Sequence, residues 1–542
     1  MRLRFRFRLF LLFALVPGIA FAQAPPLSQS LSADPQAHGH LLLVLPFENR
    51  TSQANLDWIG EAAADIFNRR LESAGFLTIS RGDRLYALDR LGLPLNLQPS
   101  RATTIRIAQT LDADDVIIGF YKMDGDRLTV SAQLLDINAL KLSPAIEQQS
   151  DLKSLLDILN GLAWRMARQL DPTYSVAEQT LLAADAPVRV DAFENYIRGS
   201  IAEAPGDRVV HLKEAVRLSP AFTPAWLALG KAYFANQEYD LAAATFGHLP
   251  KDDPNALQAD FYRGLAYFYT ANYLKAEDAF AFVSLRLPLP EVVNNQAVAA
   301  SRRGHDAGAL FQQAAVADPK DADYHFNLAV ALRRRNDIPG AIREIDQALK
   351  IHPQESEAQG FANALKNPAS IKVNPDPGKA IPDDTLPLER IKRSYNETGF
   401  RQAAFELEQL EWMRLASLPP DQRAAALVKE GDQFLNRGLI LEAERQFQSA
   451  LQASPTSALA HAGLAEVREH SGDDDAARQE AQKSLSLTPN VPAHLVLARI
   501  DLQSNQLAPA ATEVSQALKL DPANANARGM KQALESRGQQ VP

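Results

Sequence analysis

Few residues of this chain have the types and spacing that catalysis or metal binding requires. His38 and His40 would bind a transition metal if they were exposed as a pair, but two histidines in a connecting segment are usually inert. Asp473, Asp474 and Asp475 resemble calcium ligands, yet the Gly and Glu positions of a calcium loop do not follow them. The triplet is typical of a solvated turn, and we predict no metal and no cofactor.

Glu48, Asn49 and Arg50 follow an apolar run and are the remaining candidates for a small ligand site. At the end of a buried strand they would either bind a ligand or form a structural turn, and the turn is favoured. The chain has no cysteine, no Gly-rich phosphate loop, no His-Glu-x-x-His and no Gly-x-Ser-x-Gly. Because it offers no nucleophile with a base and no metal set, we predict that the protein is not an enzyme.

The strongest pattern in the sequence is a 34-residue repeat of glycine, aromatic, alanine and proline positions. The pairs one period apart are Gly230 and Gly264, Tyr233 and Tyr267, Ala242 and Ala276, Phe246 and Phe280, and Pro254 and Pro288. Trp226, Leu229 and Tyr233 share one face of a helix, and Ala242 and Phe246 share a face of the next helix. Two packed antiparallel helices at this period resemble the tetratricopeptide repeat (TPR) family, whose units stack into a superhelix.

The repeat pattern predicts two arrays of helix pairs. It runs from residue 190 to residue 366, stops over residues 367–388, and resumes over residues 389–537 with a polar closing helix. Five prolines and few large apolar residues predict that residues 367–388 are a linker. We therefore expect a mostly α fold, an α-solenoid of TPR helix pairs in two arrays.

By resemblance to the TPR family, the first helix of each pair faces a concave groove. The residues expected to line the groove of the first array are Phe234, Phe261, Phe268, Tyr269, Arg302, Arg333 and Arg334. An aromatic wall that leads to arginines suits an extended peptide with apolar side chains and an acidic group. The alternatives are that the aromatic residues pack against neighbouring helices and that the arginines are solvated. The second array carries Asp432, Glu466 and Glu469 on this face, so the two grooves should differ in charge.

The N-terminus has the three-part order of a secretory signal peptide. Four arginines precede an apolar run and an Ala20-Phe21-Ala22 site, so we assign residues 1–22 to the signal peptide and residues 23–39 to a flexible linker. Removal of these arginines would change the formal net charge from −9 to −13, which argues against nucleic acid as a partner. No later apolar stretch is long enough to span a membrane, so we expect a periplasmic or secreted protein.

Residues 40–172 have a different pattern, in which short strands alternate with helices and end in a hairpin marked by Asp124-Gly125-Asp126. This pattern predicts a small α/β domain. The domain resembles the N-terminal domain of the TolB-like family, related to CsgG-type and FlgO-type envelope domains. The motifs that carry the resemblance are Val44 to Arg50, Trp58-Ile59-Gly60, Ser80-Arg81, Ala113 to Gly119, and Arg127 to Asp136. The resemblance implies an envelope-associated, protein-binding role and no catalytic residue.

These patterns predict an exported protein-binding scaffold or adaptor of the bacterial cell envelope. Its partners would be other proteins or peptides, which the concave grooves would hold near whatever the α/β domain contacts. The alternative is a periplasmic sensor, in which the α/β domain binds a small ligand or glycan and the TPR arrays relay the event.

Overall fold

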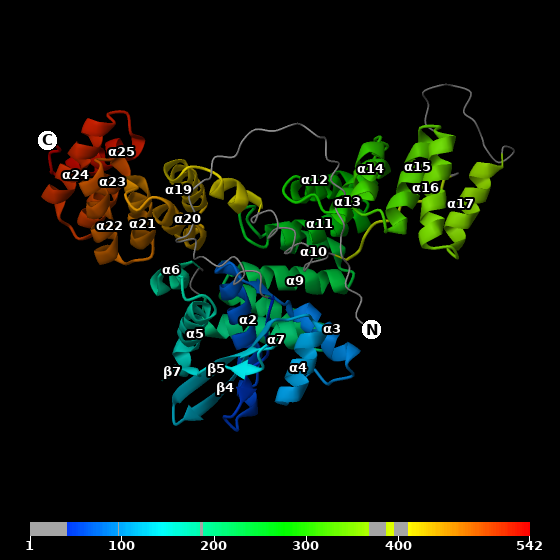
Figure 1. Cartoon of the computed structure of the whole chain (residues 1–542), viewed down its shortest axis with the longest axis horizontal. Helices are drawn as coiled ribbons and strands as arrows, with labels where there is room; N and C mark the ends of the chain where they lie inside the picture. Colours follow the sequence, from blue (N-terminus) through cyan, green and yellow to red (C-terminus); the bar gives the residue numbers. More distant parts are fainter. Residues whose placement is uncertain (1–40, 96, 185–187, 368–385, 395–409) are drawn as a thin grey trace, which may run out of the picture.

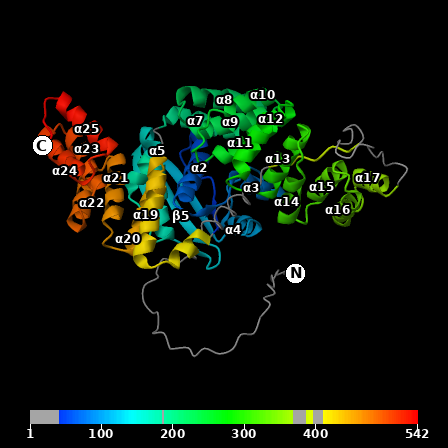
Figure 2. The same ribbon diagram turned by 90° about the horizontal axis from the view of Figure 1, so that it is seen from above.

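The computed structural model describes residues 41–95, 97–184, 188–367, 386–394 and 410–542. The predicted signal peptide 1–22, the linker 23–39 with His38, the adjacent residue His40 and most of the linker 367–388 lie outside the described residues. Two arrays of paired helices extend to either side of a small α/β domain (Figure 1), and Figure 2 shows the same arrangement from above. The described part is mostly helical, which confirms the predicted fold class.

The α/β domain is built on a seven-stranded sheet with the order β3-β1-β4-β5-β6, in which β2 also pairs with β4 and β7 with β5. The strands are β1 (Leu41–Val44), β2 (Glu48–Asn49), β3 (Leu77–Thr78), β4 (Asp115–Asp124), β5 (Arg127–Asp136), β6 (Lys141–Leu142) and β7 (Ile146–Asp151). β1 runs parallel to β3 and β4, whereas β4 and β5 form an antiparallel hairpin. The hairpin turns at Gly125, whose φ of 58° suits a residue without a Cβ.

Helices cover both faces of this sheet. Alternate strand residues explain the arrangement, because Leu42 belongs to the core beneath α2 (Trp58–Ser73) and α5 (Leu155–Leu170), whereas Leu43 belongs to the opposite core. The opposite face is covered by α3 (Arg81–Arg90) and α4 (Arg101–Thr110). The sequence pattern did not predict α3 or β7, whose residues carry little apolar periodicity.

The first array consists of five helix pairs followed by one further helix within residues 188–367. The helices are α7 (Val190–Ile201), α8 (Pro205–Leu218), α9 (Thr223–Ala235), α10 (Tyr239–Phe246), α11 (Ala256–Tyr269), α12 (Tyr273–Ser284), α13 (Pro290–Arg302), α14 (Gly308–Ala317), α15 (Ala322–Arg334), α16 (Ile338–Ile351) and α17 (Ser356–Lys366). The repeated glycines let the two helices of a pair approach each other. A Cβ on Gly230 would lie 2.5 Å from the Phe246 ring, so the ring occupies the space that any other residue would need.

The first array and the α/β domain share one continuous core. The cluster that contains Phe67 on α2 extends through Phe193 on α7 to Phe246 on α10. Tyr196 on α7 also places its hydroxyl 3.0 Å from Asp65 Oδ1 on α2. The first pairs of the array are therefore fixed against the α/β domain by packing rather than by a flexible connection.

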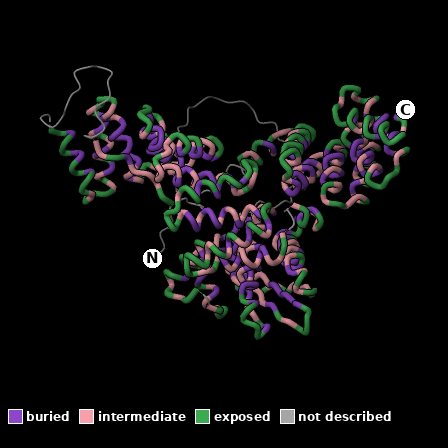
Figure 3. The backbone as a smooth tube through the Cα atoms, turned by 180° about the vertical axis from the view of Figure 1, so that it is seen from behind, coloured by how far each residue is buried: buried purple, intermediate pink, exposed green. Residues whose placement is uncertain are grey.

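Within residues 420–542, the second array consists of three helix pairs and a closing helix. These are α19 (Pro420–Asn436), α20 (Ile440–Ala453), α21 (Ala458–His470), α22 (Asp474–Leu487), α23 (Val491–Gln503), α24 (Leu507–Leu520) and α25 (Ala525–Ser536). Buried residues run along the interior of both arrays (Figure 3). The second array meets the α/β domain at α6 (Glu178–Ala183), where Glu444 Oε1 accepts the Ala177 amide hydrogen at 3.1 Å.

Candidate functional site

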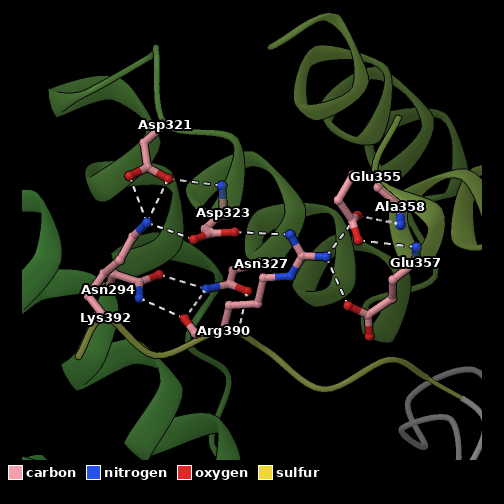
Figure 4. A network of polar contacts seen from close by, with 9 residues as sticks. All are labelled: Asn294, Asp321, Asp323, Asn327, Glu355, Glu357, Ala358, Arg390 and Lys392. Atoms are coloured by element: carbon pink, nitrogen blue, oxygen red, sulfur yellow. Dashed lines mark hydrogen bonds and ion pairs between the residues drawn. The ribbon is translucent and has the colours of Figure 1, made fainter. Parts of the chain in front are cut away.

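An extended segment of the chain itself lies against first helices of the first array, on the face that the TPR resemblance assigns to the groove. We call this segment, residues 386–394, the strap. It follows the predicted linker in sequence and crosses the first helices α13, α15 and α17 (Figure 4). The prediction that residues from 389 onward belong to the second array is wrong for residues 389–394, because these residues are not helical and contact the first array.

Buried asparagines of the array hold the main chain of the strap. Asn327 accepts the Arg390 amide hydrogen through Oδ1 at 2.7 Å and donates Nδ2 to the Arg390 carbonyl at 2.8 Å. Asn295 holds Lys392 in the same way, with both distances 2.8 Å. Asn294 donates a further hydrogen bond of 3.0 Å to the Arg390 carbonyl. These hydrogen bonds are made to the peptide groups of alternate residues, a spacing that an extended chain provides. They do not depend on the side chains of that chain.

Carboxylates along one edge of the groove bind the two basic side chains of the strap (Figure 4). Arg390 lies 2.9 Å from Asp323, 2.9 Å from Glu355 and 2.8 Å from Glu357. Lys392 Nζ lies 2.7 Å from both Asp321 and Asp323. Aromatic rings complete these two positions. The Arg390 guanidinium lies 3.8 Å from the centre of the Phe326 ring, and Lys392 Nζ lies 5.0 Å from that of Tyr324.

Glu389, which precedes Arg390, and Ile391, which lies between Arg390 and Lys392, contact other residues of the array. The Glu389 side chain is fully buried, accepts a hydrogen bond of 2.5 Å from Ser301 and pairs with Arg334. Arg302 lies 3.7 Å from the second carboxylate oxygen of Glu389. Ile391 packs against two apolar clusters of the array, which also include Phe268. Four consecutive strap residues, acidic, basic, aliphatic and basic, are therefore each matched by a different part of the groove.

The charges in the groove are mutually stabilising. Burial alone would raise the pKa of Asp323, but hydrogen bonds from Lys392 and Arg390 outweigh it and hold that pKa below its usual range. The pKa of Glu355 is lowered in the same way, since hydrogen bonds from Arg390 and from the Ala358 amide outweigh burial. Both carboxylates are therefore ionised at neutral pH when the strap is bound.

The structure brings together some of the predicted groove residues and separates others. Arg302 and Arg334 contact Glu389, Phe268 packs near Ile391, and Tyr269 lies 5.9 Å from the Arg393 guanidinium. The other three do not form part of the contacts described above. Phe261 is fully buried against the Phe280 ring, Arg333 is buried, and Phe234 packs on Tyr239, Tyr262 and Tyr269. Phe261 thus contacts α12, the second helix of its own pair.

The sequence analysis missed the asparagines and the acidic edge. Asn294, Asn295 and Asn327 are fully buried, and most of the other buried residues of their helices are apolar. A buried amide among apolar residues requires hydrogen-bonding partners, and Asn294 and Asn327 stand on successive first helices. The recurrence of asparagine on these two helices was visible in the sequence, but its burial was not.

The groove of the second array has a different character. It encloses a cavity of about 380 Å³ between α19, α21, α23 and α25. Burial, together with the nearby Glu466, raises the pKa of Asp432 on its wall. Arg499 pairs with Glu466 at 3.2 Å and with Glu469 at 2.6 Å, so the predicted acidic face is partly neutralised.

The remaining candidates of the sequence have structural roles. Asp473 caps α22 by accepting the Ala476 amide hydrogen at 3.1 Å. Asn49 accepts the Thr51 amide hydrogen at 2.8 Å and donates to Asp57 at 2.6 Å, which closes a turn. Within the described part of the chain, no group of three His, Asp or Glu residues lies close enough to hold a metal ion. Of the helices that the structure describes, none has the length and apolar character needed to cross a membrane.

Comparison with family models identifies the repeats. Two models, each described as tetratricopeptide repeat, match residues 198–263 in one case and residues 296–356 and 428–492 in the other. The chain contains tetratricopeptide repeats. The matches fall in both arrays, and the TPR helix α15 carries Asn327 and the acidic edge residue Asp323. No curated protein matches the chain.

Several solved structures are similar to parts of the chain. The LpoB C-terminal domain from Salmonella enterica is 22% identical, and the match covers 22% of this chain and 89% of that one with a TM-score of 0.19. A TPR repeat-containing protein from Cytophaga hutchinsonii is 13% identical, with 56% and 97% coverage and a TM-score of 0.20. A lipoprotein from Neisseria meningitidis is 16% identical, with 24% and 99% coverage and a TM-score of 0.19. The resemblance of residues 40–172 to TolB-like domains stays a prediction.

Proposed function

We propose that this protein is an exported scaffold of the cell envelope, which holds extended segments of partner proteins in the groove of its first TPR array. The observation that carries the proposal is the pair of asparagines that bind both main-chain groups of Arg390 and of Lys392. Main-chain recognition of this kind supplies affinity for any extended segment, and the flanking charges add specificity.

The groove is also rigid enough to act as a binding surface. Its asparagines stand on packed helices and hold one another, since Asn327 donates to Asn294 Oδ1 at 2.7 Å. A site that is already ordered loses little conformational entropy when a peptide binds. The helices therefore present the polar groups at fixed spacing, as a peptide-binding scaffold requires.

The location of the protein rests on its sequence. The arginine-rich start, apolar run and Ala-x-Ala site support export, and the absence of cysteine is consistent with a chain that needs no disulfide outside the cytoplasm. An envelope protein with a TPR groove would bind other envelope proteins or peptides. The second array and the α/β domain would position that partner relative to the rest of the assembly.

The experiment is affinity capture of the full-length protein from crosslinked cells, followed by mass spectrometry. The wild type is compared with the double variant Asn295→Ala with Asn327→Ala, which removes both pairs of main-chain hydrogen bonds to Arg390 and Lys392. The matched control is Gln313→Ala, which removes an exposed amide from the second helix α14. We expect a set of partners that the control retains and the double variant loses. Identical partners for all three proteins would refute the groove as the binding surface.

A further inference from the structure

We propose that the groove takes, from a partner protein, an extended segment with the pattern acidic, basic, aliphatic, basic, and that the strap competes for the same place. This inference rests on the proposed function and specifies it, because it names the chemistry of the partner segment. The strap is the chain's own example of that chemistry.

The groove recognises the side chains of the strap as well as its peptide groups. Four carboxylates, those of Asp321, Asp323, Glu355 and Glu357, surround Arg390 and Lys392. A segment with acidic residues at these two positions would bring like charges within about 3 Å, which excludes it. On the opposite side, the arginines favour an acidic residue at the position of Glu389.

Without an occupant, buried amides and carboxylates of the groove would lose hydrogen-bond and ion-pair partners. The buried asparagines would lose the partners that Arg390 and Lys392 now supply, and the carboxylates of α15 and α17 would face one another without cations. Buried amides without partners are costly, and like charges in a groove repel. The groove is therefore complementary to a peptide of this pattern and poorly suited to stay empty.

The strap is a local contact and not part of a helical core. Glu389 and Ile391 hold this short extended stretch on the array, but Leu388 is 61% exposed and the Arg390 and Lys392 side chains keep 21% and 20% of their surface in solvent. A short segment held by a few side chains detaches at lower free energy than the packed helices it lies on. A partner segment with equivalent residues can then occupy the position that the strap leaves.

Competition within one chain has a predictable effect on affinity. An intramolecular ligand acts at an effective concentration on the order of millimolar, so it reduces the fraction of free grooves. The apparent dissociation constant of an external peptide rises in inverse proportion to that fraction. Weakening the strap without touching the groove should therefore strengthen the binding of an external peptide.

The test is a fluorescence anisotropy titration of the full-length protein with a labelled peptide of residues 386–394, Leu-Pro-Leu-Glu-Arg-Ile-Lys-Arg-Ser. The strap variant carries Arg390→Glu with Lys392→Glu, which the four carboxylates repel. We expect this variant to bind the peptide at least about tenfold more tightly than the wild type does. The milder change Lys392→Ala should give an intermediate affinity and serves if the double variant does not fold.

Two controls make the outcome specific. A peptide with Glu in place of the arginine and lysine at positions 390 and 392 should not bind either protein, and adding Asn327→Ala to the strap variant should weaken binding by about tenfold or more. Equal affinity for the wild type and both strap variants, or no binding to any of them, would overturn the inference. The proposed function fails separately, when partner capture does not depend on Asn295 and Asn327.

Discussion

Asn327 donates one amide hydrogen to Asn294 Oδ1 and the other to the Arg390 carbonyl, so it joins α15, α13 and the strap in one buried network. Its own Oδ1 accepts the Arg390 amide hydrogen. Each polar atom of this side chain therefore has a partner, and the network connects consecutive repeats at the place where the strap crosses them. Because every hydrogen-bonding atom of this buried side chain has a partner, a residue of another shape or polarity would break the network.

The first prediction is that Asn327→Ala loosens the strap. The change removes both of its hydrogen bonds to Arg390 and leaves Asn294 Oδ1 without that donor, which costs about 1–3 kcal/mol. We expect the Arg390 amide hydrogen to exchange with solvent at least about tenfold faster, as measured by hydrogen exchange and mass spectrometry on the peptide that covers the strap. Gln313→Ala should leave this rate unchanged. An unaltered rate in Asn327→Ala would show that the asparagine does not hold the strap.

The second prediction concerns the acidic residue of the strap. Glu389→Ala leaves Arg334 and Ser301 without the buried carboxylate that they contact, and removing one partner of a buried pair costs about 3–5 kcal/mol. We expect the strap to detach. The chain has no cysteine, so cysteines introduced at Leu388 and Gln313 would be the only sites for spin labels.

The distance between these two labels should become longer and broader in Glu389→Ala than in the wild type. Glu535→Ala is the control, because Glu535 forms a surface pair with Lys531 at 3.7 Å on the distant helix α25. If the label distance stays the same in Glu389→Ala, the buried carboxylate does not anchor the strap.

The third prediction is the pH dependence of the strap. The pKa values of Asp323 and Glu355 are lowered in the bound state, so their stabilising contribution is fully present above the pKa of the free carboxyl groups, about 4. It is lost as the pH falls through the lower values of the bound state. The same spin-label distance should be constant from pH 8 to about 5 and should lengthen only below about pH 4. A midpoint near pH 6 or above would contradict the role of these carboxylates.

How far the sequence predicted the molecule depends on the kind of signal. The 34-residue period identified the helix pairs because Gly230 and Phe246 must meet inside each unit, and such packing constrains residue types directly. The hairpin at Gly125 was predictable for the same local reason. By contrast, α3 carries few apolar residues and is fixed by packing on the sheet, which no local pattern reveals.

The site was predicted less completely, because it depends on a contact between segments far apart in the sequence. Arg302 and Arg334 were assigned to the groove from the repeat register, and both contact Glu389. Their partner Glu389 was not predicted, because residues 367–388 were interpreted as a linker and residue 389 was interpreted as the start of the next array. The proline-rich composition identifies where the helical repeats stop, but it carries no information about the groove that the following residues enter.

The fourth prediction concerns the docking of the second array. Glu444 on α20 is fully buried, pairs with Arg468 on α21 at 2.6 Å and accepts the Ala177 amide hydrogen beside α6. Glu444→Ala removes the group that joins these three elements, while the helices keep their own cores. We expect small-angle X-ray scattering to show a larger radius of gyration with unchanged helical content by circular dichroism. Lys483→Ala, at an exposed position of α22, should leave both values unchanged, and a compact Glu444→Ala variant would contradict this role.

The last prediction tests the packing rule of the repeats. A Cβ on Gly264 would lie 2.8 Å from the Phe280 ring, so Gly264→Ala should destabilise the first array by about 1–3 kcal/mol and lower its melting temperature. Adding Phe280→Leu should recover part of this loss, because the shorter side chain leaves room for the methyl group. Gly360→Ala is the matched control, since a Cβ there meets no atom within 4 Å and alanine favours the exposed helix α17 by up to about 1 kcal/mol. Thermal unfolding followed by circular dichroism would measure the melting temperatures of these three variants. Equal effects at Gly264 and Gly360 would show that helix propensity, not close packing, explains the repeated glycines.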